Sequence, residues 1–160
     1  MIQPSKNRPK KQSWSPGACF AIPLIDGEFL LGQVLASEPS SLNSVSCALY
    51  NQKFPDGSAP RCDLNRVFSV VMTTRDLLDS GLWKIVGHDS VTLPKEQFPH
   101  ESLRKSGFVG AKVIGSRIIG EFANAVSGLS PWNDWADPNY LDRLLITPDA
   151  KPPNVVYKNR

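Results

Sequence analysis

Aromatic and acidic residues alternate unusually densely in one segment of the chain, GLSPWNDWADPNYLDRLL, residues 128–145. The side chains of interest are Trp132, Asp134, Trp135, Tyr140 and Asp142. Aromatic rings supply binding energy at protein interfaces, and carboxylates attract and select cationic partners. A structural interpretation competes: the tryptophans anchor a loop over the core, and Asp137 only caps a helix. Both interpretations can apply to one segment, and we take the five side chains as the candidate site for a cationic protein partner.

Cys19 is the candidate nucleophile, with His88 and an acid such as Asp89 as its partners. A catalytic cysteine needs a lowered thiol pKa, which a helix N-terminus or a basic neighbour provides. Cys19 instead lies inside an apolar, β-prone run, where a free cysteine is typically a small buried hydrophobic residue. We therefore expect no catalytic residue and no enzyme. A hydrolase that uses Cys19 or His88 is the weakest alternative.

Metal and cofactor binding are not favoured by the spacing of the ligand-bearing residues. The thiols and imidazoles of the chain belong to Cys19, Cys47, Cys62, His88 and His100. The cysteines form no CxxC pair, and the histidines lack the close spacing of a zinc ligand pair. The VGAKVIG stretch at 109–115 lacks the Gly-Lys-Ser/Thr ending of a phosphate-binding loop. We expect no metal and no cofactor.

Length and composition predict one globular domain: 160 residues, 41% of them hydrophobic and 21% charged. Apolar runs stay well short of the roughly 18–20 residues that cross a bilayer, which excludes a membrane protein. The N-terminus lacks the apolar stretch of a signal peptide, and the odd number of cysteines indicates reduced thiols. We therefore expect a cytoplasmic protein.

Charge is distributed unevenly along the chain. Residues 1–12 carry four Lys and Arg, residues 151–160 carry three, and neither segment holds an acid. The eleven Lys and Arg and fifteen Asp and Glu of residues 13–150 leave that body at −4. This pattern predicts a basic disordered tail at 1–12, a single domain at 13–150 and a basic C-terminal tail at 151–160.

The first half of the chain reads as antiparallel strands. Two apolar, β-prone runs flank Asp26-Gly27, which predicts a hairpin within residues 17–37. Further strands are predicted at 45–50, 66–72 and 82–87, with a short helix at 75–80 that Thr74 caps and Gly81 ends. The result is a curved antiparallel sheet, with an SH3-like barrel as its expected closed form.

The second half changes to a helical period. Apolar residues recur at helical spacing after Ser116, which predicts a helix that ends at Gly128. A second helix is predicted to begin at Asp137-Pro138 and to bury its leucines before Pro148. The fold class is therefore α+β, a curved N-terminal sheet followed by a C-terminal helical pair.

Three stretches together resemble the immunity protein 26 family of bacterial polymorphic toxin systems. They are PGACFAIPLIDGEFLLGQVL at 16–35, LWKIVGHDSV at 82–91, and the series Gly128-Leu129, Pro131-Trp132, Asp137-Pro138 and Tyr140-Leu141-Asp142. The resemblance spans about Pro16 to Leu145. At two positions the chain departs from the family pattern, with Ala18 where an acid is common and Leu30 where an aromatic residue is common.

The resemblance implies a cytoplasmic, non-enzymatic protein that binds a cognate toxin domain and blocks its active region. The acidic body agrees in sign, because many toxins that attack nucleic acids are cationic. The alternative from a different class is a small β-barrel module that grips nucleic acid with its basic tails. We consider nucleic acid the less favoured partner, since the positive charge lies outside the predicted domain.

Overall fold

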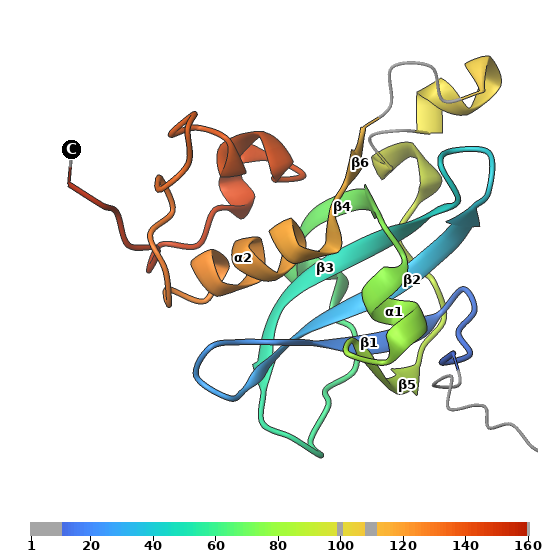
Figure 1. Ribbon diagram of the computed structural model, residues 1–160, viewed down its shortest axis with the longest axis horizontal. Helices are drawn as coiled ribbons and strands as arrows, with labels where there is room; N and C mark the ends of the chain where they lie inside the picture. The colour runs from blue at the N-terminus through green and yellow to red at the C-terminus, as the bar shows by residue number, and fades with distance from the viewer. Residues whose placement is uncertain (1–10, 99–100, 108–111, 160) are drawn as a thin grey trace, which may run out of the picture.

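The computed structural model describes residues 11–98, 101–107 and 112–159. Its centre is a six-stranded, mostly antiparallel sheet in the order β5-β1-β2-β3-β4-β6 (Figure 1). The strands are β1 (Ala18–Pro23), β2 (Phe29–Glu38), β3 (Ser44–Phe54), β4 (Val67–Thr73), β5 (Lys84–His88) and β6 (Val113–Ile114). The five strands predicted from the sequence are confirmed. The two-residue β6, which pairs parallel to β4, was not predicted.

The predicted closure into a barrel is wrong, and the sheet is open. Its outer strands, β5 and β6, lie at opposite edges and do not pair with each other. Alternate side chains of the central strands enter two apolar clusters, so that Phe20 and Ile22 join one cluster and Cys19 and Ala21 the other. Because both faces are covered by other segments, the sheet buries its apolar residues without closing.

Gly32 on β2 is a point of close approach between two neighbouring strands. A Cβ added at this position would lie 2.5 Å from the ring of Phe20 on the neighbouring strand. The Phe20 ring in turn stacks on Trp83 with 5.1 Å between centroids. Because Gly32 has no side chain, the Phe20 ring can pack directly against the backbone of β2.

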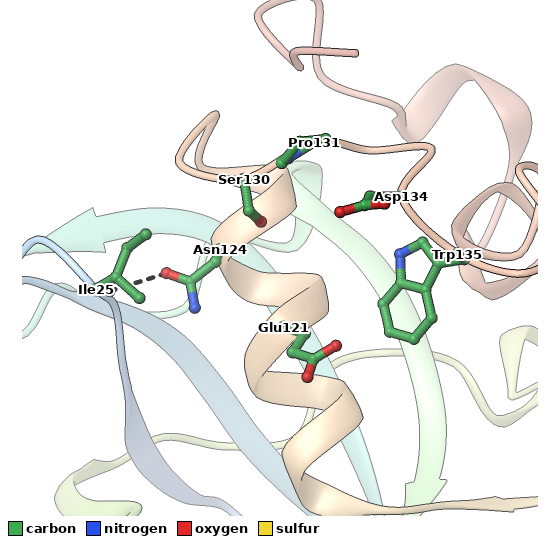
Figure 2. A pocket seen from close by; sticks show the side chains of 7 residues that line it. All are labelled: Ile25, Glu121, Asn124, Ser130, Pro131, Asp134 and Trp135. Carbon is green, nitrogen blue, oxygen red and sulfur yellow. Dashed lines mark hydrogen bonds between the residues drawn. The ribbon is translucent and has the colours of Figure 1, made fainter. Parts of the chain in front are cut away.

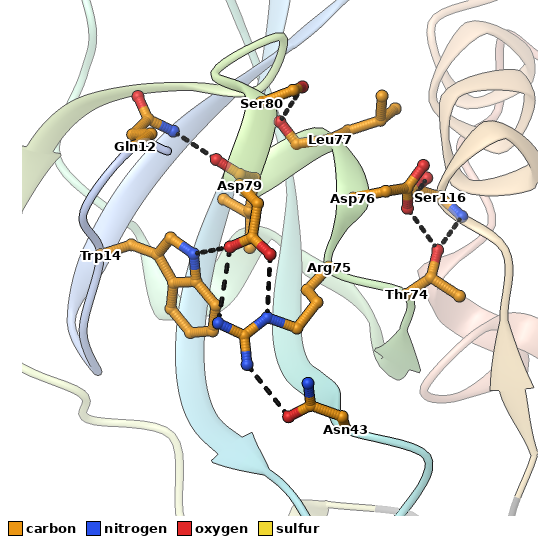
Figure 3. A network of polar contacts seen from close by, with 11 residues as sticks. Gln12, Trp14, Asn43, Thr74, Arg75, Asp76, Leu77, Asp79, Ser80 and Ser116 are labelled. Atoms are coloured by element: carbon orange, nitrogen blue, oxygen red, sulfur yellow. Dashed lines mark hydrogen bonds and ion pairs between the residues drawn. The ribbon is translucent and has the colours of Figure 1, made fainter. Parts of the chain in front are cut away.

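Two α-helices, α1 (Asp76–Ser80) and α2 (Ser116–Val126), pack on the same face of the sheet (Figure 1). Gly81 and Gly128 follow them in the left-handed conformation, as the sequence predicts. Thr74 does not cap α1; its Oγ1 accepts from the backbone N–H of Ser116, 3.0 Å away, and so caps α2 (Figure 3). The hydroxyls of Thr74 and Ser116 both donate to Asp76 at 2.7 Å, which joins the two helices.

The predicted C-terminal helical pair is wrong, because α2 is the last α-helix of the described residues. The chain after Pro138 forms only a 3-10 turn, η4 (Leu141–Leu144). From the end of this turn onward the backbone is hydrogen-bonded to β4. The Ser69 hydroxyl donates to the carbonyl of Leu144, and Ile146 N donates to Phe68 O at 2.8 Å. These bonds need extended backbone where a continuing helix would have coiled away from the sheet.

The remaining helical turns are of the 3-10 type: η1 (Leu64–Arg66), η2 (Lys95–Gln97), η3 (Glu101–Ser106) and η5 (Pro148–Ala150). A buried ion pair fixes η3 to the end of β2. The two terminal guanidinium nitrogens of Arg104, Nη1 and Nη2, donate to the carboxylate of Glu38 at 3.0 and 2.9 Å, and Ser46 donates to the same carboxylate at 2.6 Å. Glu38 is 1% exposed, so its charge depends on these partners.

Both segments predicted as basic tails include residues bound to the domain. Residues 1–10 lie outside the described part of the chain, but Gln12 donates to the carbonyls of Leu78 and Trp83, each at 2.9 Å. Trp14 donates to Asp79 (Figure 3). At the other end, residues 151–158 lie against the 131–134 loop. Within the described ranges, no helix has the length and apolar character to cross a membrane.

Candidate functional site

The segment that carries the candidate binding residues is hydrogen-bonded to the C-terminal residues 156–158, which run beside it. Pro131 forms a parallel β-bridge with Val156, and Trp132 N donates to Val156 O at 2.7 Å. Asn133 exchanges two hydrogen bonds with the backbone of Lys158, at 3.0 and 2.7 Å. The loop is therefore fixed at each of its central residues.

Trp132 and Asp142 are built into the fold. The Trp132 ring is 0% exposed and packs edge-on against Phe122 of α2, 5.9 Å between centroids. Its indole N–H donates to Asp142 Oδ1 at 3.0 Å, and Lys151 lies 3.1 Å from the same oxygen. The ammonium of Lys151 also lies 5.2 Å from the Trp132 ring centroid. These contacts match the structural interpretation of one of the two tryptophans.

Trp135 and Tyr140 lie closer to the surface. Their rings are 4.9 Å apart between centroids, and both are half-buried against the main cluster. Asp137 between them does not begin a helix; it accepts from Asn139 N at 2.9 Å and pairs with Arg143, forming a tight turn. The hydrogen bond from Asn139 and the nearby guanidinium hold the pKa of Asp137 below its usual value.

Asp134 and Trp135 line a surface pocket of about 220 Å³, which we call the acidic pocket. Its lining residues are Ile25, Glu121, Asn124, Ser130, Pro131, Asp134 and Trp135 (Figure 2). They come from the β1–β2 turn, from α2 and from the 130–135 loop. Glu121 was not among the predicted site residues, because nothing in the sequence marks the exposed face of α2 as part of a site.

The walls of the acidic pocket are fixed by the backbone. Ile25, 71% exposed at the hairpin turn, donates its N–H to Asn124 Oδ1 at 2.9 Å (Figure 2). Asn124 in turn donates to Gly120 O within α2 at 3.1 Å. Asp134 is half-exposed and lies 3.3 Å from the ammonium of Lys158. The pocket thus combines two carboxylates with an exposed aliphatic side chain and an indole ring.

A second constellation was missed by the sequence analysis. Cys19 is buried as predicted, but its Sγ lies 3.6 Å from Cys62 Sγ and 3.9 Å from Asp89 Oδ2. Within the described residues these three side chains form a group able to hold a metal ion. Hydrogen bonding from Cys62 lowers the pKa of the Cys19 thiol, and the same contact together with burial raises that of Cys62.

Of the residues considered for a catalytic cysteine, namely Cys19, His88 and Asp89, only some are in contact with one another. The structure brings Asp89 to Cys19, and His88 lies on the rim of the same pocket of about 260 Å³. The His88 imidazole packs on Gly17, where an added Cβ would lie 2.5 Å from its Cε1. Cys47 is buried in the cluster on the opposite face, which raises its pKa, and His100 lies outside the described residues.

Comparison of the chain with protein-family models, with curated proteins and with solved structures gives no match.

Proposed function

We propose that the chain binds a cationic protein partner through the acidic pocket. The observation that carries this proposal is the meeting of the Glu121 and Asp134 carboxylates with the exposed faces of Trp135 and Ile25. A lysine or arginine side chain has the matching chemistry: its methylene groups lie along apolar surface while its charge faces carboxylates and an indole ring. An anionic or wholly apolar ligand would cover the Glu121 carboxylate without supplying a compensating charge.

The size of the pocket favours one side chain of a protein over a free small molecule. Pockets that enclose small-molecule ligands usually measure about 300–1,000 Å³. The acidic pocket, at about 220 Å³, is smaller. An anchor residue of a larger interface fills such a hollow, and the interface around it supplies the remaining contact area.

Lys158 holds the place that a partner's cation would take next to Asp134. Both side chains of this pair are more than half exposed, at 59% and 52%. Exposed ion pairs contribute about 0–1 kcal/mol. A partner that presents its own cation can therefore displace Lys158 with little loss, whereas Asp142 is bonded to the buried indole of Trp132, which would be costly to displace.

We infer the class of partner from the resemblance of the chain to the immunity protein 26 family. On that basis the partner is a cognate toxin domain, and the chain neutralises it by covering its active region. Attraction of a cationic toxin would come from the Glu121 and Asp134 carboxylates themselves rather than from net charge, because Lys11, Lys151 and Lys158 bring the −4 of residues 13–150 to −1 over residues 11–159. Trp135 and Tyr140 would act as the aromatic anchors of that interface, with Asp134 and Glu121 selecting for charge.

The experiment measures binding of the toxin domain encoded beside this chain's gene, inactivated by mutation, by surface plasmon resonance. Asp134→Lys should slow association about 10-fold at low salt and less at high salt, because steering is screened. Trp135→Ala should speed dissociation about 30-fold, as for an interface anchor worth about 2 kcal/mol. Asp149→Lys and Leu82→Ala are the matched controls, since each makes a similar change at an exposed position outside the pocket.

Melting curves of all four variants separate binding from folding. The acidic pocket is rejected as the binding site if Asp134→Lys and Trp135→Ala bind as the controls do. The toxin partner is rejected if the neighbouring gene product is not bound while the chain is retained on DNA with a steep dependence on salt. That second result would favour the nucleic-acid module instead.

A further inference from the structure

Three segments that are distant in sequence meet at Cys19, Cys62 and Asp89. Cys19 lies on β1, Cys62 in the loop between β3 and β4, and Asp89 directly after β5. The two sulfur atoms are 3.6 Å apart, Cys19 Sγ is 3.9 Å from Asp89 Oδ2, and all three ligand atoms lie within 4.8 Å of one another. We call this group the dithiol site.

The loop that carries Cys62 is clamped on both sides of the cysteine by one side chain. Gln52, 8% exposed on β3, donates to Arg61 O at 2.7 Å and accepts from Asp63 N at 2.8 Å. Cys62 itself donates its backbone N–H to Asp89 Oδ2 at 2.9 Å. These hydrogen bonds fix the backbone at residues 61–63, so the Cys62 thiol has a defined position although it lies in a surface loop.

Asp89 is likewise fixed in position by contacts of its backbone and its side chain. Its N–H donates to Gly17 O at 3.0 Å, and its carbonyl accepts from the buried amide of Gln33 at 3.0 Å. The guanidinium of Arg61 lies 3.4 Å from its other carboxylate oxygen. Partners of this kind orient the ligands of metal centres and compensate part of their negative charge.

We propose that the dithiol site binds a thiophilic divalent cation, with Zn²⁺ as the best fit. Tetrahedral Zn²⁺ with sulfur ligands at about 2.3 Å and oxygen at about 2.0–2.2 Å places two sulfur atoms about 3.8 Å apart and a sulfur and an oxygen atom about 3.5–3.7 Å apart. The S–S separation of 3.6 Å and the S–O separation of 3.9 Å lie within about 0.4 Å of these distances. Two thiolates select Zn²⁺ over Mg²⁺ or Ca²⁺, which prefer oxygen ligands only.

The surroundings provide access and a fourth position. A surface pocket of about 260 Å³ is lined by Cys19 and Asp89, together with Pro60 and His88, and has room for a cation and one water. Cys19 belongs to the cluster on the face of the sheet away from α2. The dithiol site is therefore separate from the acidic pocket, and its occupancy does not depend on the proposed partner.

The experiment titrates the reduced full chain with Co²⁺ in the absence of oxygen. One equivalent of Co²⁺ should bind and give the charge-transfer absorption of thiolate ligation in the near ultraviolet, and Zn²⁺ should displace it. Zn²⁺ should also raise the melting temperature, because a ligand of the folded state stabilises it. Cys47→Ala is the matched control, since it removes a buried thiol outside the site and should keep both signals.

Variants at the site decide the outcome. Cys19→Ala and Cys62→Ala should each lose the charge-transfer band, and Asp89→Asn should weaken Co²⁺ binding by more than about 10-fold. Cys62 is only half-buried, so its variant remains informative if Cys19→Ala does not fold. The proposal fails if the wild type shows no thiolate band. It also fails if oxidised glutathione joins Cys19 and Cys62 in a disulfide, releasing two glutathione molecules, in a chain that binds no Co²⁺.

Discussion

Replacement of Arg104 by alanine tests how strongly the buried Glu38 depends on its partner. Glu38 is 1% exposed and receives two guanidinium hydrogen bonds, at 3.0 and 2.9 Å, plus one from Ser46. The contact with Glu38, with a second one to Glu101, raises the pKa of the Arg104 guanidinium, which therefore stays charged at every pH that the fold tolerates. Arg104→Ala consequently removes a permanent charge from beside a buried carboxylate.

The loss of unfolding free energy in Arg104→Ala can be estimated from the burial of the ion pair. Removing one member of a buried ion pair costs about 3–5 kcal/mol. The Arg104 side chain is 41% exposed and Ser46 remains in place, so we expect the low end, about 3 kcal/mol. For a chain of this size that loss lowers the melting temperature by about 6–12 °C. Urea unfolding at pH 7, followed by tryptophan fluorescence, gives the free energy directly.

Two further variants make the measurement specific. Lys105→Ala, at the exposed neighbouring position, should change stability by less than about 0.5 kcal/mol. Glu38→Gln combined with Arg104→Ala should be more stable than Arg104→Ala alone, because the neutral amide leaves no unpaired charge in the core. The reasoning is refuted if Arg104→Ala unfolds like the wild type, or if the double variant is less stable than the single one.

Four other predictions concern stability. Gly120→Ala should raise it by about 1 kcal/mol in urea unfolding, since an added Cβ meets nothing within 4 Å in α2. Gly128→Ala should lower it by about 1 kcal/mol or more, because its φ is +74° and the Cβ would lie 3.1 Å from a carbonyl oxygen of the C-terminal segment. Burial acts to raise the pKa of Asp76, but two hydroxyl hydrogen bonds outweigh it and the pKa lies below the usual value. Its contribution is therefore present above about pH 4 and lost below, so Asp76→Asn should destabilise at pH 7 and differ less from the wild type as acid unfolding begins. Trp132→Phe should cost about 1–2 kcal/mol in the same urea assay, because Asp142 loses a buried donor.

Local patterns in the sequence predicted most of the elements. The Asp26-Gly27 hairpin, the strands of the first half and α2 follow from short-range periodicity and turn chemistry, and the structure confirms them. Gly81 and Gly128 adopt the left-handed conformation that ends a helix. Each of these features depends on residues that are neighbours in the chain, which is the information a single sequence carries.

Long-range contacts decided the features that were predicted wrongly or missed. The helix expected after Pro138 yields to the hydrogen bonds that β4 offers to Leu144 and Ile146. The dithiol site joins residues 43 positions apart in the chain, and no spacing rule for metal ligands detects such a pair. Of the acidic pocket, Asp134 and Trp135 were predicted, whereas Glu121 enters only because α2 runs beside the loop.

Burial of the sheet on both faces has a consequence for amide hydrogen exchange. The amides of β2 and β3 lie between paired strands and beneath two apolar layers, so they should exchange with solvent only when the whole domain unfolds. The edge strands β5 and β6 are short and only half-buried, so their amides should exchange through local openings of much lower free energy. Asp89 directly follows β5, and a fluctuation that frees this edge also loosens the carboxylate from the two thiols. Exchange rates along β5, measured with and without Zn²⁺, therefore report on the dithiol site from the backbone beside it.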